Sequence, residues 1–484
     1  MGRSVVIVGA GLGGLSAAIY ARLAGFDVLL LEQHAVVGGK AAGIEQDGFS
    51  LDPGPSIVIL PEIYESVFRA AGRQSEDYLT FQRLDPFSRV YFENEGFLDL
   101  PADRYQCLEL LQRQFPADAA SFDELMRKLD QVAPKVRQSV FDHPYDQWWQ
   151  LFDPRLAAVG VAFDLRSSYR QIVDRWFQSP LLRAFFYGFP SYGGQTYDAK
   201  APGAFLIPYF MLEGGVYYPK GGVAAIPRAL ERLAREIGVE IQTGKAVTGF
   251  RSVGNRLTGV LSTDGVIEAE LVISNRDRLK TREWLGERVE WEPSFSYFTV
   301  HWGIRRKLAG LSHHTLLVPQ QFVQGFEKLY GERRFPDPSI IYLNVTSETD
   351  SATAPQGMTN LFAVVTVPAQ CGDVDWDRDA QLLAERIRGA LRQYGLQFDQ
   401  EDVVFERIQT PQYFEETHGN YQGSLYGPDE KYRLFGLLPL RNYDEQFKNL
   451  FYCGGSVQPG AGMPMAVLSG RFAVERLARR NPST

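Results

Sequence analysis

Apolar residues near the N-terminus change their spacing twice. The run from Val5 to Val8 is β-branched throughout, which is typical of a strand buried on both faces. Leu15, Ile19 and Leu23 then recur at helical spacing, and a second apolar run extends from Val28 to Leu31. The pattern predicts a strand, a helix and a second strand in that order.

Glycines and one acid occupy the positions in this unit that a bound dinucleotide requires. Gly9, Gly11 and Gly14 lie between the first strand and the helix. The first permits a tight turn, the second lets backbone approach a pyrophosphate, and the third lets the helix pack against the strand. The helix N-terminus favours phosphate, and Glu32 ends the second strand, where a carboxylate can bind ribose hydroxyls. The sequence therefore predicts a dinucleotide-binding βαβ unit.

Two short segments after this unit could also approach the cofactor. Gly39 and Lys40 place a glycine and a cation just past the second strand. Gly54, Pro55 and Ser56 lie in a rigid, kinked loop. We expect both segments to contribute to the cofactor site.

Alternating elements resume at Gly215. A short strand is followed by an amphipathic helix that carries Ile226 and Leu233, and then by a strand from Val239. Three further strands are expected over residues 246–251, 257–262 and 266–273, with Gly-containing turns between them. This order predicts the second half of a two-unit nucleotide-binding domain, in which the backbone of Val247 contacts the adenine.

The C-terminal segment repeats the strand–turn–helix arrangement. A strand is expected over residues 450–453 and a helix over 465–479. The turn between them is rich in glycine and proline, and a helix N-terminus follows it, so it is a second site for close backbone approach to a flavin. The candidate contacts in this turn are Gly455, Ser456, Gly462, Met463 and Pro464.

These patterns predict an α/β protein with a discontinuous two-unit Rossmann-like domain. We assign residues 1–75, 215–290 and 441–484 to the nucleotide-binding domain. Residues 76–214, which are rich in helical patterns, and 291–440, which alternate strands and helices, form an inserted substrate domain of helices and a mixed sheet. In it we expect strands over 295–304 and 360–367 and helices over 102–115, 121–140 and 377–394.

The amino-acid composition limits the classes of molecule that the protein could bind. The 484 residues carry a formal net charge of −8, which argues against nucleic acid, and 13% aromatic residues, which suit a large apolar cavity. Three distant cysteines and the pair His313–His314 give no metal-ligand spacing. We expect no signal peptide and no spanning helix. The apolar segment from Ala201 to Leu212 is interpreted as a buried wall or a membrane-surface element.

The whole set of motifs resembles the bacterial-type carotenoid (phytoene) desaturase family of FAD-dependent, amine-oxidase-like flavoproteins. The nucleotide motifs fit the wider superfamily, and two segments narrow the resemblance to polyene enzymes: YPKGG, which ends at Gly222, and PGAGMP, which begins at Pro459. The resemblance implies bound FAD and desaturation of a long isoprenoid, with hydride transfer to flavin N5 and loss of a proton. It also implies peripheral attachment to the cytoplasmic side of a membrane, and oxygen or a quinone as electron acceptor.

The sequence departs from the family pattern in two places. The acid that many members place after the last strand is replaced by Gly455-Ser456, so a carbonyl or the serine hydroxyl would hold the ribityl chain. The family is often described with an acid and an arginine that handle protons in the inserted helices, and Asp153 and Arg155 lie in roughly that region. No specific motif supports the match, so the catalytic residues stay unassigned.

Several alternatives stay open. Within the family, the chain could oxidise a terminal methyl group of a carotenoid or isomerise a polyene. Outside it, the substrate could be a soluble amine or a porphyrinogen. A prenyl-binding carrier without FAD is disfavoured, because its nucleotide site should be degenerate, whereas Gly9, Gly11, Gly14 and Glu32 are intact.

Overall fold

A parallel sheet built from distant parts of the chain holds the two termini together. The computed structural model describes residues 3–144, 153–155, 159, 162–433 and 440–480. Five strands pair in parallel in the order β19 (Leu450–Tyr452), β13 (Leu271–Ser274), β1 (Ser4–Val8), β2 (Asp27–Leu31) and β9 (Glu240–Gln242). Because the apolar runs of β1 and β13 are buried on both faces, helices must cover this sheet on either side.

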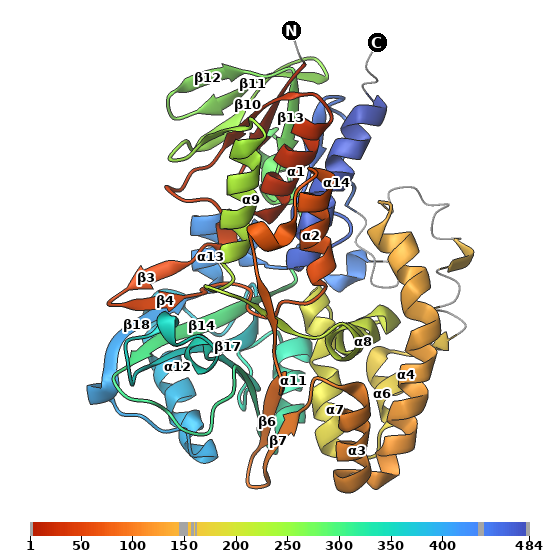
Figure 1. The fold of residues 1–484 in the computed structure, drawn as a ribbon, viewed down its shortest axis with the longest axis vertical. Coiled ribbons are helices and arrows are strands. Elements are labelled where there is room, and N and C mark those ends of the chain that lie inside the picture. Colours follow the sequence, from red (N-terminus) through yellow and green to blue (C-terminus); the bar gives the residue numbers. More distant parts are fainter. Residues whose placement is uncertain (1–2, 145–152, 156–158, 160–161, 434–439, 481–484) are drawn as a thin grey trace.

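Three long helices pack around this sheet. They are α1 (Leu12–Leu23), α9 (Ala225–Glu236) and α14 (Met463–Arg480). Figure 1 shows α14, from the C-terminal end, lying beside α1, from the N-terminal end. A glycine makes this close contact possible, since a Cβ added at Gly470 would lie 2.4 Å from the carbonyl oxygen of Gly13. The helix α2 (Pro61–Ala70) packs against α14.

The strand expected over residues 266–273 is wrong as a single element. The segment forms two strands in different sheets: β12 (Gly265–Glu268) completes a meander with β10 (Val247–Val253) and β11 (Arg256–Ser262), and β13 joins the parallel sheet. The reason is burial, because β12 is mostly exposed whereas all four residues of β13 are buried.

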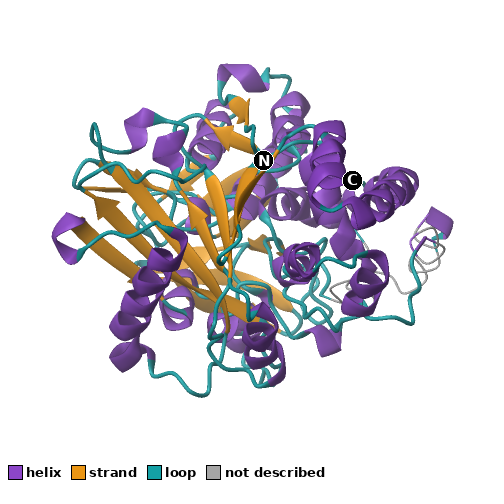
Figure 2. Cartoon of the chain, turned by 90° about the horizontal axis from the view of Figure 1, so that it is seen from below, coloured by secondary structure: helices purple, strands orange, loops and turns teal. Residues whose placement is uncertain are grey.

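A mixed sheet forms the second layer of the molecule. Its seven strands follow the order β18 (Val403–Gln409), β14 (Phe295–Ile304), β17 (Thr359–Pro368), β16 (Ile341–Asn344), β15 (His314–Val318), β6 (Ser88–Phe92) and β7 (Gly96–Leu100). Only β15 and β6 pair in parallel. One face packs on α12 (Trp376–Leu391) through residues such as Phe298 and Val365. The opposite face is free to line a cavity. Figure 2 draws all strands of the molecule in orange, those of this sheet among them.

Helices enclose the space next to that free face. On the right of Figure 1 they form a separate group beside the mixed sheet: α3 (Arg104–Gln114), α4 (Pro116–Val136), α6 (Tyr169–Trp176), α7 (Pro180–Tyr187) and α8 (Leu206–Glu213), with α11 (Phe322–Phe326) closer to the sheet. The helix expected over 121–140 starts earlier, because Pro116 occupies its first turn, where proline is favoured.

Shorter elements complete the fold. Among the described residues, the other α-helices are α10 (Arg278–Trp284) and α13 (Pro411–His418). Two small ribbons pair β3 (Ile44–Gln46) with β4 (Phe49–Leu51) and β5 (Phe81–Arg83) with β8 (Tyr217–Pro219). Within the described ranges, no helix is both long enough and apolar enough to cross a membrane.

Candidate functional site

One cavity of about 700 Å³ extends from the first βαβ unit into the space between the mixed sheet and the helices. It is lined at one end by Gly9, Gly11 and Glu32, and at the other by aromatic residues such as Tyr297 and Phe326. The parallel sheet, the mixed sheet and the helices therefore all contribute to a single site.

The glycine motif forms the floor of the first end. Gly9 has φ +94°, a conformation that favours glycine, and a Cβ at Gly11 would lie 2.8 Å from the side-chain nitrogen of Asn275. No side chain caps the N-terminus of α1, so its first N–H groups stay available to a phosphate. Gly14 does not line the cavity. A Cβ there would lie 2.0 Å from the Gly9 carbonyl oxygen, so this glycine lets the helix meet the strand.

The carboxylate of Glu32 is buried at the end of β2. It accepts hydrogen bonds from the backbone N–H of Ala10, at 2.7 Å, and of His34, at 2.9 Å. These bonds fix both oxygens beside the glycine turn. A carboxylate has about four acceptor positions, so two remain for ribose hydroxyls.

Replacing Glu32 with glutamine is expected to weaken FAD binding about 10- to 100-fold. The amide has one acceptor oxygen instead of two, so one buried N–H loses a charge-assisted bond worth roughly 1.5–3 kcal/mol. Titration of the apoprotein with FAD, followed by flavin fluorescence, measures the change. Glu240→Gln on the neighbouring strand β9, whose side chain is exposed and does not line the cavity, is the matched control and should bind as the wild type does. Equal affinity in both variants would contradict this role.

The two segments that follow the βαβ unit meet at the cavity. Gly39, Lys40, Gly54, Pro55 and Ser56 all line it. A Cβ at Gly54 would lie 1.8 Å from the carbonyl oxygen of Lys40, so the two backbones cross in contact. The Lys40 ammonium donates to the side-chain oxygen of Asn420 at 3.1 Å, and burial lowers the Lys40 pKa although the nearby Asp277 opposes the shift.

The C-terminal turn closes the same end of the cavity. Gly455, Ser456, Gly462, Met463 and Pro464 line it, and so does Val247 on β10. The helix begins at Met463, two residues earlier than expected. The Ser456 hydroxyl oxygen accepts from the backbone N–H of Arg278 at 2.9 Å, which leaves its O–H able to donate into the cavity.

Asn275 is a site residue that our sequence analysis did not select. It follows β13 directly and lines the cavity, and its side chain packs against the glycine turn. A signal was present, because ligands of parallel sheets bind at the carboxyl ends of the strands and Asn275 ends one of them. With it, the glycines, the uncapped helix and Glu32 form a cradle that fits a dinucleotide.

The second end of the cavity is an apolar chamber. Its sheet side uses alternate residues of four strands, as the period of two requires. These residues are Tyr297, Thr299, His314, Leu316, Tyr342, Phe362, Val364 and Thr366. Helices and helical turns supply the other side through Phe185, Phe189, Leu206, Ile207, Phe210, Met211, Phe322 and Phe326. The segment 201–212 therefore includes part of the chamber wall.

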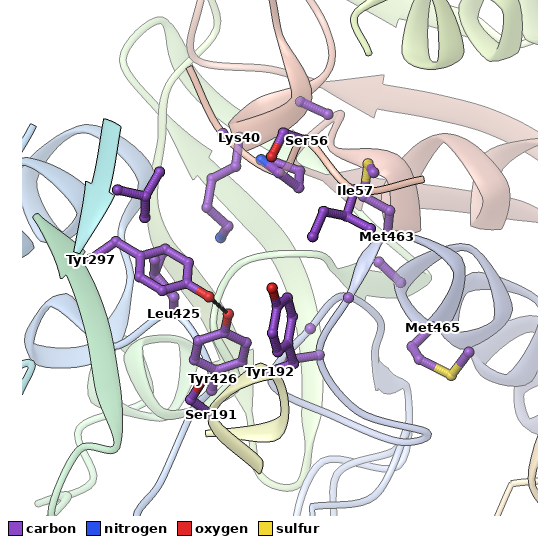
Figure 3. Close-up of a pocket in the computed structure, with 18 of the residues that line it drawn as sticks. Lys40, Ser56, Ile57, Ser191, Tyr192, Tyr297, Leu425, Tyr426, Met463 and Met465 are labelled. Atoms are coloured by element: carbon purple, nitrogen blue, oxygen red, sulfur yellow. Dashed lines mark hydrogen bonds between the residues drawn. The ribbon is translucent and has the colours of Figure 1, made fainter. Parts of the chain in front are cut away.

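A group of tyrosines lies between the two ends. Figure 3 shows the hydroxyl groups of Tyr297 and Tyr426 pointing toward one another, where they form a hydrogen bond, with Tyr192 beside them. Lys40 and Ser56 lie on the opposite side of the cavity. Burial raises the pKa of the Tyr297 and Tyr426 phenols, so both are uncharged at neutral pH.

Two other candidates lie differently from the cofactor residues. Asp153 and Arg155 form an ion pair at 2.7 Å, and neither lines the cavity. His314 lines it, whereas His313 does not and instead bonds to the Thr349 hydroxyl at 2.7 Å. In the part of the chain that the structure describes, no three metal-ligating side chains gather at one point.

Comparisons with known proteins agree with this arrangement. The chain matches the flavin containing amine oxidoreductase family over residues 12–478. It is 34% identical to a zeta-carotene-forming phytoene desaturase of Myxococcus xanthus, over 98% of this chain and 94% of the relative. It is 31% identical to a 4,4'-diaponeurosporene oxygenase of Staphylococcus haemolyticus (strain JCSC1435), over 98% of this chain and 97% of the relative.

A solved structure shares the fold along the whole chain. An oxidoreductase from Methanosarcina mazei aligns with a TM-score of 0.63 at 18% identity, covering 98% of this chain and 100% of its own. This likeness, together with the parallel and mixed sheets, confirms the α/β fold class expected from the sequence.

Proposed function

Since this chain belongs to the flavin-containing amine oxidoreductase family, we propose that it is an FAD-dependent enzyme that desaturates a long isoprenoid of the carotenoid type. Its cofactor is FAD, in keeping with the family and the dinucleotide cradle. The observation that carries the proposal is the continuity of the cavity, which joins that cradle to an apolar chamber. A chamber of this kind suits a hydrocarbon chain better than a charged amine.

The cofactor residues follow from the same geometry. Backbone at Gly9, Gly11 and the α1 N-terminus would hold the pyrophosphate, and Glu32 the ribose. Val247 would contact the adenine, and Ser456 would donate to the ribityl chain. The full proposed set adds the cavity-lining residues Gly39, Lys40, Gly54, Pro55, Ser56, Gly455, Gly462, Met463 and Pro464. It also includes Gly14, which would act by letting α1 pack against β1. When bound, FAD supplies a hydride acceptor.

The protein's own contribution is to position the hydrocarbon and exclude water. The chamber is mostly aliphatic and aromatic, so it orders an apolar chain against the cofactor end. Burial lowers the pKa of His314 and raises that of Tyr342, so both are neutral at physiological pH. A positive charge that develops on the substrate would therefore meet no charge on His314 or Tyr342 and would be spread along the polyene.

Co-expression with a polyene-producing pathway tests the function directly. Desaturation removes two hydrogens for each double bond introduced and lengthens the conjugated system, so product mass falls and absorption moves to longer wavelength. A product with added oxygen would favour the second candidate, terminal oxidation, which the relative named as an oxygenase supports. A product of unchanged mass would indicate isomerisation. Unchanged pigment in the presence of an FAD-loaded protein would contradict the proposal.

The division into domains is also a proposal. Residues 1–75, 215–290 and 441–484 would form the FAD-binding domain, which the five parallel strands support because each lies in one of these segments. Residues 76–214 and 291–440 would form the substrate domain, supported by the mixed sheet and the helices that face it.

Peripheral membrane attachment follows from the proposed substrate, which is stored in lipid. We expect the FAD-loaded protein to float with liposomes and to be released from them without a detergent that dissolves the bilayer. In cells, we expect it on the cytoplasmic side of the membrane. The acceptor of the electrons would be oxygen or a quinone. A protein that stays wholly in the soluble fraction of a flotation gradient would contradict attachment.

A further inference from the structure

A chain of polar groups crosses the otherwise apolar wall of the chamber. The Ser56 hydroxyl bonds to the Tyr342 hydroxyl at 2.7 Å, and the Tyr342 hydroxyl bonds to Nδ1 of His314 at 2.7 Å. All three residues line the cavity, and they come from the loop after β4, from β16 and from β15. Segments far apart in the sequence thus place one connected polar path beside the hydrocarbon site.

The inner end of this path has an unused polar atom. His314 is only 2% exposed, and its Nε2 has no hydrogen-bond partner among the described residues. Buried polar atoms are nearly always paired, because an unpaired one loses its bonds to water without replacement. A leucine or phenylalanine would serve the packing of a hydrocarbon chamber better. The imidazole therefore points to a chemical role.

The outer end of the path meets the proposed cofactor residues. Ser56 follows Gly54 and Pro55 in the loop that touches Lys40. In Figure 3, Ser56 lies on the same side of the cavity as Lys40 and Ile57, across from Tyr192 and Tyr426. A hydrocarbon that enters from the chamber would pass between these sides and reach Ser56.

We propose that Ser56, Tyr342 and His314 form the proton-accepting relay of the desaturation, with Ser56 as the catalytic residue and His314 as the final acceptor acting through Tyr342. The proposal deepens the function above and rests on it. It assigns a proton acceptor to a reaction for which the sequence offered none.

The proposed step balances as follows. Bound FAD would supply the hydride acceptor, so that one allylic C–H bond would lose its hydrogen with both bonding electrons. The neighbouring C–H bond then breaks, its electrons form the new double bond, and its proton moves to the Ser56 oxygen. The Ser56 proton passes to Tyr342, and the Tyr342 proton passes to Nδ1 of His314, which becomes an imidazolium. The His314 proton would return through Tyr342 and Ser56 and leave with the electron acceptor, oxygen or a quinone, once that acceptor had taken up the two electrons.

The charges around the relay fit this direction. Burial, with a smaller contribution from His313, lowers the pKa of His314. The imidazole is therefore neutral before each turnover and can accept the proton during the reaction. Asn344 also places its side-chain nitrogen 3.4 Å from Nδ1, which favours Nδ1 as an acceptor and Nε2 as the protonated nitrogen. A weak base is sufficient, because a C–H bond beside a carbocation is strongly acidic.

Three substitutions test the relay in the FAD-loaded protein. His314→Gln keeps a hydrogen-bond acceptor but cannot bind a proton, Tyr342→Phe breaks the path, and Ser56→Ala removes its outer end. Each should slow product formation about 100-fold or more in anaerobic single-turnover experiments, as expected for lost general-base catalysis. Substrate deuterated at the carbon that loses the proton should show a larger isotope effect in His314→Gln than in the wild type. The FAD content of His314→Gln and Tyr342→Phe should stay the same, because neither residue belongs to the proposed cofactor set.

His313→Gln is the matched control. His313 is also buried, at 5% exposed, but it does not line the cavity and lies outside the Ser56–Tyr342–His314 path. Its replacement should therefore change the rate far less than the three relay substitutions do and should leave the isotope effect unchanged. Product formation at the wild-type rate in His314→Gln and Tyr342→Phe would overturn the relay. Absence of any product from the wild type would instead count against the proposed function.

The protonation state of His314 can be measured without turnover, and this measurement on the wild type stays informative even where a variant fails to fold. The chain has six histidines, so the imidazole signals of the ¹⁵N-histidine-labelled holoprotein can be assigned by subtraction. We expect His314 to be neutral with the proton on Nε2, and Nδ1 to lose its bond in Tyr342→Phe. A proton on Nδ1 in the wild type would overturn the relay, because Nδ1 could not then accept from Tyr342.

Discussion

The variant Gly14→Ala should purify without FAD. A Cβ at this position would lie 2.0 Å from the Gly9 carbonyl oxygen, far inside van der Waals contact. The clash is with the backbone of Gly9, which cannot swing aside as a side chain can, so α1 must move away from β1, and the turn that holds the pyrophosphate moves with it. Overpacking costs about 1–3 kcal/mol and more in the tightest cases, to which a 2.0 Å approach to backbone belongs. The ratio of flavin absorbance to protein absorbance in the purified sample measures the loss.

Gly389→Ala is the matched control for this prediction. Gly389 lies exposed in α12, and no heavy atom lies within 4 Å of an added Cβ. Alanine is the better helix former, so this variant should keep its FAD and gain about 0.5–1 kcal/mol in the free energy of unfolding. Full FAD occupancy in Gly14→Ala would contradict the close helix–strand contact that we assign to this glycine.

The second large effect is expected from a charge placed in the chamber. Leu206 on α8 is 8% exposed and lines the cavity, so Leu206→Asp introduces a polar group that has no partner among the apolar residues around it. The variant should keep FAD, because Leu206 lies outside the cradle, but conversion of a polyene should fall about 100-fold or more. The aspartate retains water where a hydrocarbon must bind, and expelling that water costs roughly 2–7 kcal/mol.

Leu382→Asp is the matched control, because it makes the same leucine-to-aspartate change outside the cavity. Leu382 lies on α12 and is 50% exposed, so a charge there is solvated and should not alter conversion. FAD content and melting temperature separate a blocked chamber from an unfolded protein. Wild-type conversion by Leu206→Asp would contradict the placement of the substrate between α8 and the mixed sheet.

The parts of the site that could be predicted are those encoded locally. The strand, Gly9, Gly11 and Glu32 lie within thirty residues of one another, and each has a backbone requirement that shows in the residue type. The C-terminal turn from Gly455 to Pro464 was recognisable for the same reason. The cavity brings these segments together, and their role in binding FAD remains the proposal made above.

The parts that could not be predicted depend on pairing between distant strands. Tyr342 and His314 line the chamber because β16 pairs with β15, a register that neither strand encodes alone. The boundary between β12 and β13 was not predicted, for a related reason. Residues 266–273 read as one strand by composition, and only the choice of partner strand separates the exposed half from the buried half.

Anaerobic titration of the FAD-loaded protein with a polyene precursor such as phytoene, delivered in liposomes, tests the central claim most directly. If cradle and chamber form one catalytic site, the flavin absorbance should bleach, with one new double bond in the product for each FAD reduced. Bleaching by a soluble amine such as putrescine, with none by the polyene, would contradict the account.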